Sequence, residues 1–582
     1  MIAKAALPKA VWPGMEAYME RLFKTHRIRK SGVIDGLWRF YPEGKPDEGR
    51  QVLIPSCVET YPGYENYRGV SVFEKEIFLQ GNVRFCLKGV SHTAEVFLDG
   101  KKAGGHYNAY TPFEIVVKDV KAGRHFLRVK ADNSCHSDSA LHLINDYYNY
   151  GGITRPVAVE EVGALFIRHI HVKSFRKDGV WYGEFTLYME NLEDEAREAG
   201  LTLDMSDFCM SNPDMAGSTE IKPIWEKETV TLQPGLNQWK KDIALPWVET
   251  YELDAPRMYQ VWGRLWNQDE AVDDLIDRVG FREIRVRGNR IYFNEKPVMI
   301  KGFNRHEDHA LFGCAIPPEG MDYDLRLMEE MGANAVRTCH YPNDERFLDL
   351  CDEKGILVWE EGHARGLDEK QMRHPNFRKQ SLDCLKEMVE NHYNHPSIFT
   401  WGILNECASE TEYGREVYAE QYALLRKLDE SRPLTSATCR HFSDICLGLP
   451  DIVSVNIYPG WYFDEDVKEY LEKIYTWVQE TEGKGKPFIV SEIGAGAISG
   501  YHAPHRPKWS EERQCDILRE QLTGVLGFEA GSGVFIWQFC DGRVPDETFG
   551  GRPCCQNNKG IVDGYRRRKL AFGTVKEIFT GR

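Results

Sequence analysis

Phe399-Thr-Trp-Gly-Ile-Leu-Asn405-Glu406 and Pro487-Phe-Ile-Val-Ser-Glu492 are two short apolar stretches, and each ends in a glutamate. Their aromatic and β-branched residues predict buried β-strands. An unpaired buried charge costs several kcal/mol, so a carboxylate at the tip of each strand is unfavourable for packing alone. Two such tips among alternating strands and helices indicate the mouth of a (β/α)₈ barrel, where barrel enzymes place their reacting groups.

The second half of the chain carries eight predicted strands of this kind, separated by segments with apolar residues at helical spacing. The predicted strands are Val298–Asn304, Asn334–His340, Ile356–Glu360, Phe399–Glu406, Leu434–Thr438, Ile452–Tyr458, Phe488–Glu492 and Gly533–Phe539. The predicted helices are Asp324–Met331, Glu345–Lys354, Phe377–His392, Arg415–Leu428, Val467–Glu480 and Glu512–Leu526. Eight strands with intervening helices match the composition of a TIM barrel.

The first half of the chain is predicted to be all-β, because short alternating runs are broken by Gly, Pro and Asn about every ten residues. The predicted strands are Val70–Phe78, Val83–Leu87, Ala94–Leu98, Phe113–Val117, His125–Val129, Tyr182–Glu190, Thr229–Leu232 and Tyr259–Trp266. We therefore expect a multidomain β plus α/β protein. Its domains would be a jelly-roll-like, sugar-binding-like β domain (1–163), an immunoglobulin-like β-sandwich (164–287) and a C-terminal (β/α)8 TIM barrel (288–582).

Composition agrees with a large protein of several domains and argues against some partners. The 582 residues exceed what one core supports. With 73 basic and 89 acidic residues the net charge is −16, which argues against nucleic acid and anionic membranes as partners. No apolar run approaches the roughly 20 residues that span a bilayer. No signal peptide is expected at this start, although a native leader could have been removed.

Cysteine usage and motif spacing bear on compartment and cofactors. The fifteen cysteines are scattered and include no C-x-x-C pair, which fits a reducing compartment and predicts a cytoplasmic protein. The run His306-Glu-Asp-His309 is not H-E-x-x-H, so we expect no metal and no cofactor. We also expect a homo-oligomer, a dimer or tetramer. The basic clusters His26–Lys30 and Arg566–Lys569 are interpreted as solvated faces.

Longer motifs around the two glutamates resemble glycoside hydrolase family 2. The stretch ending in Glu406 resembles the family's acid/base signature, and the stretch ending in Glu492 resembles its nucleophile strand. Further matching motifs are Asn145–Pro156, Gly302–Asp308, Val336–Pro342 and Asn456–Tyr462. The resemblance runs from about Gly36 to the end of the chain. It implies a retaining exo-β-glycosidase, consistent with two glutamates facing each other at a barrel mouth.

The resemblance implies a role for each motif residue. Glu492 would be the nucleophile, and Glu406 would be the general acid and then the general base. Arg337 would keep Glu492 ionised, Tyr458 would orient it, and Asn405 would bind the sugar 2-hydroxyl. Further substrate contacts are implied for Asp146, His306, Tyr462 and Trp537. Asp146 could instead be a turn cap, and Trp537 could be core packing.

One more motif bears on the substrate. Asn557-Asn558-Lys559-Gly560 resembles the Asn-x-Lys element by which the family's β-glucuronidases hold the sugar carboxylate. An ammonium and an amide N–H₂ converging on a carboxylate form charge-assisted bonds that a neutral hexose cannot use. A polar loop is the structural alternative. The motif predicts a small-molecule or oligosaccharide β-uronide as substrate, with β-D-glucuronides first.

Two departures from the family pattern leave the exact substrate open. Ile457 and Pro459 stand where glucuronidases carry Arg and Tyr, so a β-D-galacturonidase or a dual-specificity hexuronidase is an alternative. A β-galactosidase and, more remotely, a non-catalytic carbohydrate-binding protein are further alternatives. The segment between Glu361 and His395 is short, which predicts an open mouth that accepts bulky or saccharide aglycones.

Overall fold

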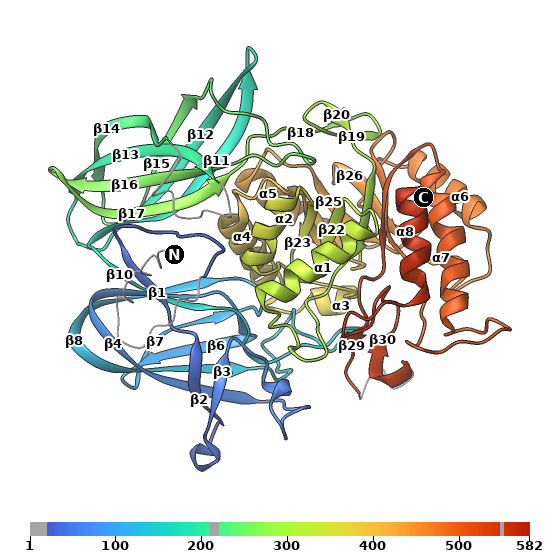
Figure 1. The fold of residues 1–582 in the computed structure, drawn as a ribbon, viewed down its shortest axis with the longest axis horizontal. Helices are drawn as coiled ribbons and strands as arrows, with labels where there is room; N and C mark the ends of the chain where they lie inside the picture. Colours follow the sequence, from blue (N-terminus) through green and yellow to red (C-terminus); the bar gives the residue numbers. More distant parts are fainter. Residues whose placement is uncertain (1–19, 209–219, 547–551, 582) are drawn as a thin grey trace, which may run out of the picture.

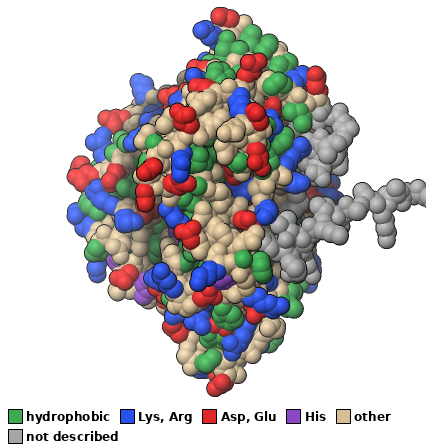
Figure 2. Space-filling model, turned by 90° about the vertical axis from the view of Figure 1, so that its left-hand side faces the viewer, with side chains coloured by type: hydrophobic (Ala, Val, Ile, Leu, Met, Phe, Trp, Pro, Cys, Tyr) green, Lys and Arg blue, Asp and Glu red, His purple; other side chains and the backbone are tan. Residues whose placement is uncertain are grey.

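The computed structural model describes residues 20–208, 220–546 and 552–581. In Figure 1 two β-rich regions lie one above the other, blue and green, beside a yellow-to-red barrel wrapped in helices. Figure 2 shows that acidic and basic side chains are interspersed over the face turned toward the viewer. Among the described residues, no helix is both long enough and apolar enough to cross a membrane.

The first β region is an eight-stranded sheet with the order β1-β10-β4-β8-β6-β7, to which β2 and β3 are joined through β4. Its strands are β1 (Lys30–Val33), β2 (Gly36–Pro42), β3 (Arg50–Ile54), β4 (Val70–Leu87), β6 (Thr93–Leu98), β7 (Lys101–Tyr107), β8 (Phe113–Asp132) and β10 (Val157–Val162). A separate short pair joins β5 (Val90–Ser91) to β9 (Gly152–Ile153). The long strands β4 and β8 each cover two of the strands predicted from the sequence.

The continuity of β4 corrects the predicted break between Phe78 and Val83. The register of β4 against β8 shifts on both sides of Gly81, whose φ is 69°. Glycine adopts this left-handed conformation without steric cost, so the chain forms a bulge and continues in the same direction. Gly81 therefore lies at a bulge inside one long strand and does not end the strand.

The second β region consists of two sheets that enclose one apolar core. The sheet β11-β12-β15 packs through residues such as Leu187 against the sheet β14-β13-β16-β17, which contributes Leu203 and Val261. The strands are β11 (Leu165–Lys177), β12 (Val180–Asn191), β13 (Arg197–Phe208), β14 (Lys222–Leu232), β15 (Gly235–Ala244), β16 (Met258–Asn267) and β17 (Glu270–Val279). Two antiparallel sheets packed face to face agree with the expected immunoglobulin-like sandwich.

A closed barrel of eight parallel strands follows, which confirms the predicted fold class. Its strands are β21 (Ile300–Asn304), β22 (Ala335–Thr338), β23 (Leu357–Glu361), β24 (Ile398–Asn405), β25 (Leu434–Thr438), β26 (Ile452–Asn456), β27 (Phe488–Ile493) and β28 (Gly531–Ile536). A small antiparallel sheet, β18 (Ile284–Arg287), β19 (Arg290–Phe293) and β20 (Lys296–Pro297), leads into the barrel. The domain boundaries near 163 and 287 stay predictions.

Helices cover the outside of the barrel. They are α1 (Pro318–Glu330), α2 (Glu345–Lys354), α3 (Glu369–Met372), α4 (Phe377–His392), α5 (Glu412–Leu428), α6 (Val467–Gln479), α7 (Glu511–Leu526) and α8 (Leu570–Thr580). Residues 439–451, between β25 and β26, form turns instead of a helix. A short hairpin of β29 (Gly542–Arg543) and β30 (Gln556–Asn557) precedes α8.

The barrel interior is apolar at one end and polar at the other. Ile300, Trp359, Phe399, Ile489 and Phe535 pack together inside the strands. The polar and charged side chains of the strands lie beyond this layer, at the C-terminal tips. This division places the charged groups at the end of the barrel where TIM-barrel enzymes carry out their chemistry.

The two basic clusters interpreted as solvated faces are solvated only in part. Lys30, Arg567 and Arg568 are exposed, whereas the interpretation is wrong for the buried members of each cluster. Arg29 and Arg566 are 6% and 4% exposed. Arg566 Nε donates to Asp324 Oδ1 at 2.6 Å, and Lys569 Nζ donates to Asp541 Oδ1 at 2.7 Å. The acidic partners lie far away in the sequence, so no local pattern reveals that the charges are paired.

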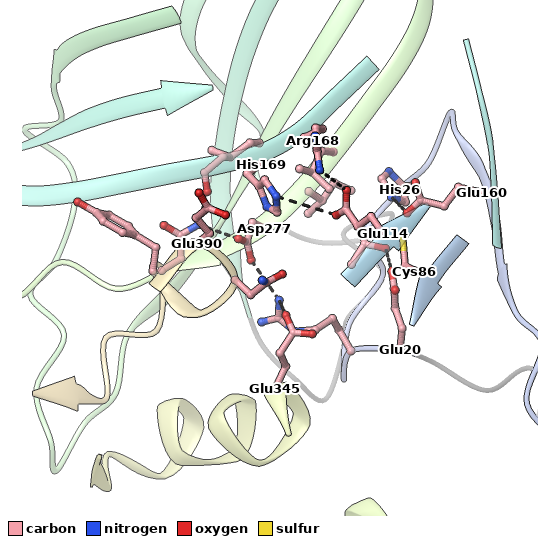
Figure 3. Close-up of a pocket in the computed structure, with 18 of the residues that line it drawn as sticks. Glu20, His26, Cys86, Glu114, Glu160, Arg168, His169, Asp277, Glu345 and Glu390 are labelled. Carbon is pink, nitrogen blue, oxygen red and sulfur yellow. Dashed lines mark hydrogen bonds and ion pairs between the residues drawn. The ribbon is translucent and has the colours of Figure 1, made fainter. Parts of the chain in front are cut away.

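A polar cavity of about 80 Å³ lies where the two β regions meet the barrel (Figure 3). Its lining charges are paired with one another. Arg168 Nη2 lies 2.9 Å from Glu114 Oε2, and Lys88 Nζ lies 2.9 Å from Glu345 Oε2. None of the lining residues stands at a C-terminal tip of a barrel strand. The cavity is therefore part of the junction between the regions and separate from the barrel mouth.

Candidate active site

The carboxylate of Glu492 stands at the tip of β27 between two donors. Arg337 Nη1 donates to its Oε1 at 3.0 Å, and the Tyr458 hydroxyl donates to its Oε2 at 2.6 Å. The Arg337 guanidinium is itself fixed by two bonds of 2.9 Å to Glu361. Burial and the nearby Glu406 carboxylate raise the pKa of Glu492 to about 7, while Arg337 and Tyr458 oppose the rise.

Glu406 follows β24 in a strained backbone conformation. Its φ is 54°, in the left-handed region that non-glycine residues adopt at a cost of about 1–2 kcal/mol. Asn456 Nδ2 donates to Glu406 Oε1 at 2.9 Å, and Arg365 Nη2 lies 3.6 Å from Oε2. Such strain persists where the surroundings hold the residue in place and often marks a reacting group.

A short hydrogen-bond chain joins the two glutamates. Asn405 Oδ1 accepts from Arg337 Nη2 at 2.8 Å and from Asn456 Nδ2 at 3.2 Å. Arg337 contacts Glu492, and Asn456 contacts Glu406, so the two carboxylates are joined through three residues. The amide nitrogen of Asn405 is buried and has no acceptor among the described residues, which leaves it able to donate to a ligand.

Lys559 is a buried cation whose charge the described part of the protein does not compensate by a hydrogen bond. The residue is 2% exposed, and no described group accepts a hydrogen bond from its ammonium. The rings of Tyr458, Trp461 and Tyr462 surround Nζ at 5.9, 5.9 and 5.2 Å from their centroids. Burial, and then the Arg552 guanidinium, lower the pKa of Lys559 to about 7. An arriving anion would supply the missing partner.

Asp146 reaches this side of the pocket from the first β region. Its Oδ2 accepts from Arg552 Nη2 at 2.5 Å and from Asn557 Nδ2 at 3.2 Å. Its Oδ1 and the Asn557 Oδ1 are buried and lack a hydrogen-bond donor among the described residues. Two free acceptors near a free ammonium suit a ligand that carries hydroxyl groups beside an anion.

A wall of rings closes another side of the pocket. The Trp537 ring, at the end of β28, stacks on His340 with centroids 5.1 Å apart and meets His306 edge-on at 5.4 Å. Burial lowers the pKa of both histidines well below their usual value, so both are neutral near pH 7. Nε2 of each histidine is buried without a partner among the described residues. The wall therefore combines a flat apolar surface with two free polar atoms.

The structure brings the predicted site residues together at the C-terminal end of the barrel. Arg337 Nη2 lies 3.3 Å from His340 Nδ1, which joins the ring wall to the nucleophile side, and the Tyr462 ring lies 5.2 Å from that of Tyr458. The predicted residues are Asp146, His306, Arg337, Asn405, Glu406, Tyr458, Tyr462, Glu492, Trp537, Asn557 and Lys559. The sequence did not single out Glu361, Asn456, Arg365 or Arg552. Glu361 and Asn456 end barrel strands and were identifiable by that position. Arg365 and Arg552 lie in loops, and no local pattern indicates where their side chains point.

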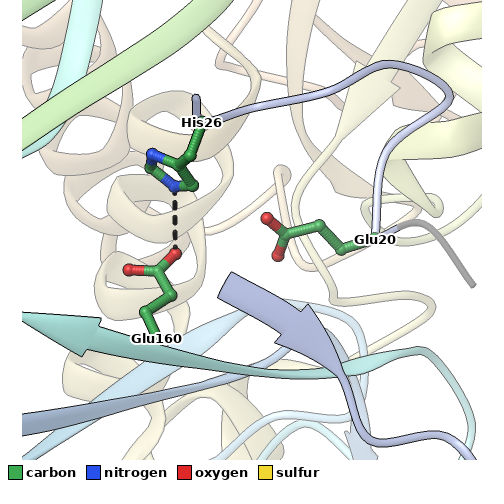
Figure 4. A group of neighbouring side chains, drawn as sticks. All are labelled: Glu20, His26 and Glu160. Carbon is green, nitrogen blue, oxygen red and sulfur yellow. Dashed lines mark hydrogen bonds and ion pairs between the residues drawn. The ribbon is translucent and has the colours of Figure 1, made fainter. Parts of the chain in front are cut away.

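Two clusters of carboxylates and histidines outside the pocket are ion-pair networks. In the group of Glu20, His26 and Glu160 (Figure 4), Glu160 already accepts from Arg29 and Arg84 at 2.8 and 2.7 Å. In the group of Asp349, Asp352 and His395, Asp349 accepts from both Arg21 and Arg278 at 2.7 Å. Guanidinium groups occupy the positions where a metal ion would need free ligands, so neither cluster supports a metal site.

Comparison with known proteins agrees with this geometry. Residues 284–581 match the family model described as glycosyl hydrolases family 2, TIM barrel domain. The chain belongs to glycoside hydrolase family 2. It is therefore a glycoside hydrolase, as the sequence motifs predict. A crystal structure of a GH2 β-galacturonidase from Eisenbergiella tayi bound to galacturonate is similar, with 49% identity, a TM-score of 0.91 and coverage of 97% of this chain and 99% of that one.

Curated relatives are more distant. A β-glucuronidase from Bacteroides fragilis is 28% identical over 94% of this chain and 81% of its own length. A putative β-glucuronidase from Formosa agariphila is 26% identical over 89% of this chain, which spans 65% of that longer protein.

Proposed function

We propose that the protein is a retaining exo-β-hexuronidase that hydrolyses terminal β-D-hexuronides. The observation that carries the proposal is Lys559, a buried ammonium with no hydrogen-bond acceptor among the described residues. A uronic acid carboxylate would pair with it and gain charge-assisted bonds, whereas a neutral hexose would leave the cation desolvated and unpaired.

The reaction follows from the two glutamates. Glu492 attacks the anomeric carbon while the glycosidic C–O bond breaks and Glu406 gives its proton to the leaving oxygen. Glu406 then takes a proton from water, whose oxygen displaces Glu492 from the sugar. Glu492 has to be ionised to attack. Burial and then the Glu406 carboxylate raise its pKa to about 7, while Arg337 and Tyr458 favour the ionised form.

The other pocket groups bind the sugar in this proposal. Arg337 and Tyr458 stabilise the ionised nucleophile, and Asn405 donates to the 2-hydroxyl. Asp146 and Asn557 accept from hydroxyls near the carboxylate. The ring wall of Trp537 with its two histidines covers one face of the sugar.

The proposal includes both hexuronide epimers at C4. β-D-Glucuronides are the first expectation from the sequence, and relatives named β-glucuronidase support them. β-D-Galacturonides are supported by the 49% identity to the Eisenbergiella tayi β-galacturonidase and by Ile457 and Pro459, which replace the residues usual in glucuronidases. A β-galactosidase would have no use for Lys559, and a non-catalytic carbohydrate-binding protein would not need two linked glutamates.

The test compares kcat/KM on p-nitrophenyl β-glucuronide, β-galacturonide and β-galactoside for the natural protein and for Lys559→Ala. We expect uronide hydrolysis to fall in the variant by about 2–5 kcal/mol of transition-state binding, because the sugar carboxylate loses its buried partner. β-Galactoside hydrolysis should fall far less or rise. Asn557→Ala should give the same pattern more mildly. Equal losses on all three substrates would contradict the proposal.

We further propose a cytoplasmic homo-oligomer, a dimer or a tetramer, built from chains with domains at 1–163, 164–287 and 288–582. The cysteines that the structure describes are all free thiols, which supports a reducing compartment. Size-exclusion chromatography with light scattering tests the oligomeric state.

A further inference from the structure

Arg365, in the segment after β23, has no part in the proposed reaction although its guanidinium lies 3.6 Å from Glu406 Oε2. The backbone holds it firmly: Gly366 N donates to Asn405 O at 2.8 Å, and Asn405 N donates to Ala364 O at 3.1 Å. The side chain is 24% exposed, so part of it reaches solvent.

Arg337 and Arg365, which lie beside the two glutamates, differ in how many of their guanidinium N–H groups are hydrogen-bonded to the protein. All three guanidinium nitrogens of Arg337 donate to buried protein groups, including Glu361, Asn304 and Asn405. The Arg365 guanidinium has one hydrogen bond to the described protein, from Nη1 to Asn145 Oδ1 at 2.7 Å. Most of its N–H donors are therefore available to a ligand.

The position of Arg365 identifies which part of a substrate it would meet. The acid/base carboxyl has to contact the glycosidic oxygen, and the leaving group begins at that oxygen. A guanidinium beside that carboxyl and open to solvent lies on the leaving-group side. The carboxylate of the sugar itself is already assigned to Lys559.

Among the described residues, the Glu406 carboxylate pairs with the Arg365 guanidinium at 3.6 Å. An anionic group on the leaving portion of the substrate would engage the remaining N–H donors of that guanidinium. The same contact would hold the leaving oxygen beside Glu406.

We propose that Arg365, held in place by Asn145, is a leaving-group subsite for a carboxylate, so that preferred substrates are hexuronides attached to an acidic aglycone such as a second uronic acid. Planar guanidinium groups bind carboxylates through two parallel hydrogen bonds, which suits this geometry. The inference rests on the proposed hexuronidase function, and it narrows the substrate class to acidic oligosaccharides and aryl carboxylates.

The test uses two substrates that differ mainly in charge, the β-hexuronides of 3-hydroxybenzoate and of 3-hydroxybenzamide. For the natural protein we expect kcat/KM to favour the benzoate on the order of tenfold, the effect of one charge-assisted contact at a partly exposed site. Added salt should reduce this preference, because exposed charge pairs are screened. In Arg365→Gln the preference should fall to about one, and Arg365→Lys should retain part of it.

A matched variant separates this role from a structural one. Arg373→Gln removes the same charge from an exposed side chain that pairs with Glu369 on α3. That variant should keep both the preference for the benzoate and its salt dependence.

The outcomes distinguish this inference from the function on which it rests. If neither substrate is hydrolysed, the hexuronidase proposal fails and this inference fails with it. If both are hydrolysed equally well by the natural protein, the leaving-group subsite is refuted and the hexuronidase remains. Equal loss on both substrates in Arg365→Gln would assign the residue to the sugar or to Glu406, and would also refute the subsite. The comparison of the benzoate and benzamide substrates in the natural protein tests the subsite even if the Arg365→Gln variant does not fold.

Discussion

Some buried polar groups at the active site form hydrogen bonds within the protein, and others have no hydrogen-bond partner among the described residues. Arg337 is bonded through each nitrogen, which fixes the nucleophile side of the site. Asn405 Nδ2 and Asp146 Oδ1 are buried without a hydrogen-bond partner among the residues that the structure describes, and the Lys559 ammonium lies against the faces of aromatic rings. Buried polar atoms cost about 1–3 kcal/mol each when unpaired, so a site keeps several of them only where a ligand completes the set.

The first prediction concerns the two carboxylates. Glu406→Ala should lower kcat by about 10²–10⁴-fold, the contribution of one general acid/base, and Glu492→Ala should remove turnover through the covalent intermediate. Thermal unfolding should show both variants folded. Proton NMR of the released sugar should show that the β-anomer forms first. A retaining enzyme also requires the carboxyl groups of Glu406 and Glu492 to lie about 5–5.5 Å apart. Release of the α-anomer would contradict the assignment.

The second prediction is a difference between two pH profiles. Lys559 loses its positive charge near pH 7. Because kcat/KM reports the free enzyme, its logarithm on a hexuronide should fall above about pH 7, and a neutral glycoside should lack this fall. In Lys559→Ala the fall near pH 7 should be absent with both substrates. Identical pH profiles for the two substrates in the natural protein would show that Lys559 does not bind the substrate.

The site residues differed in how far the sequence revealed them. Glu406 and Glu492 stood out because a carboxylate ending an apolar run has a desolvation cost that packing cannot explain. Asp146 and Lys559 emerged only through family motifs, since they come from different parts of the chain. Arg365 was missed because its importance lies in a distance to Glu406, which no local pattern contains.

Among the elements, the barrel strands were the most predictable. Each is a short apolar run bounded by polar turns, and a parallel strand buried on both faces requires such a run. All eight predicted strands occur in the expected order, with bounds shifted by a few residues. The sheet of the first β region was less predictable, because a bulge at Gly81 and a chain reversal give the same local signal.

The third prediction concerns the end of α2, where Gly355 caps the helix with φ of 66°. A Cβ there would overlap the Leu253 carbonyl, which belongs to the segment before the barrel. Gly355→Ala should therefore lower the free energy of unfolding by about 1–2 kcal/mol, because alanine is strained in the left-handed conformation. The steric overlap should lower it by about 1–3 kcal/mol more. Calorimetry should show a lower Tm for the barrel transition.

Gly485 provides the matched control for this substitution. It lies between α6 and β27 with φ of 78°, and a Cβ there would meet no atom within 4 Å. Gly485→Ala should show the left-handed penalty alone. If both variants lost the same stability, the contact with Leu253 would have no energetic role.

In the whole molecule, buried ion pairs join the β regions to each other and to the barrel. Arg29 is the clearest case: its guanidinium donates to Asp273 in β17 at 2.9 Å and to Glu160 in β10 at 2.8 Å. It therefore connects the two β regions. The sequence could not predict this role, because Arg29 lies in a basic cluster that looks solvated when its distant partners are unknown.

The last prediction compares Arg29 with its neighbour Lys30. Arg29→Ala leaves Asp273 and Glu160 buried with one fewer cation, which should cost about 3–5 kcal/mol of stability. The ion pair of Lys30 with Glu161, with side chains 51% and 24% exposed, should be worth about 0–1 kcal/mol, so Lys30→Ala should hardly change the Tm. Both variants remove one positive charge from adjacent positions, so a difference between them measures burial and not net charge. Calorimetry at equal ionic strength should show the sandwich transition lowered only in Arg29→Ala, with kcat/KM unchanged below that transition. Equal Tm values for the two variants would mean that the junction is stabilised by its apolar contacts and not by the buried charges.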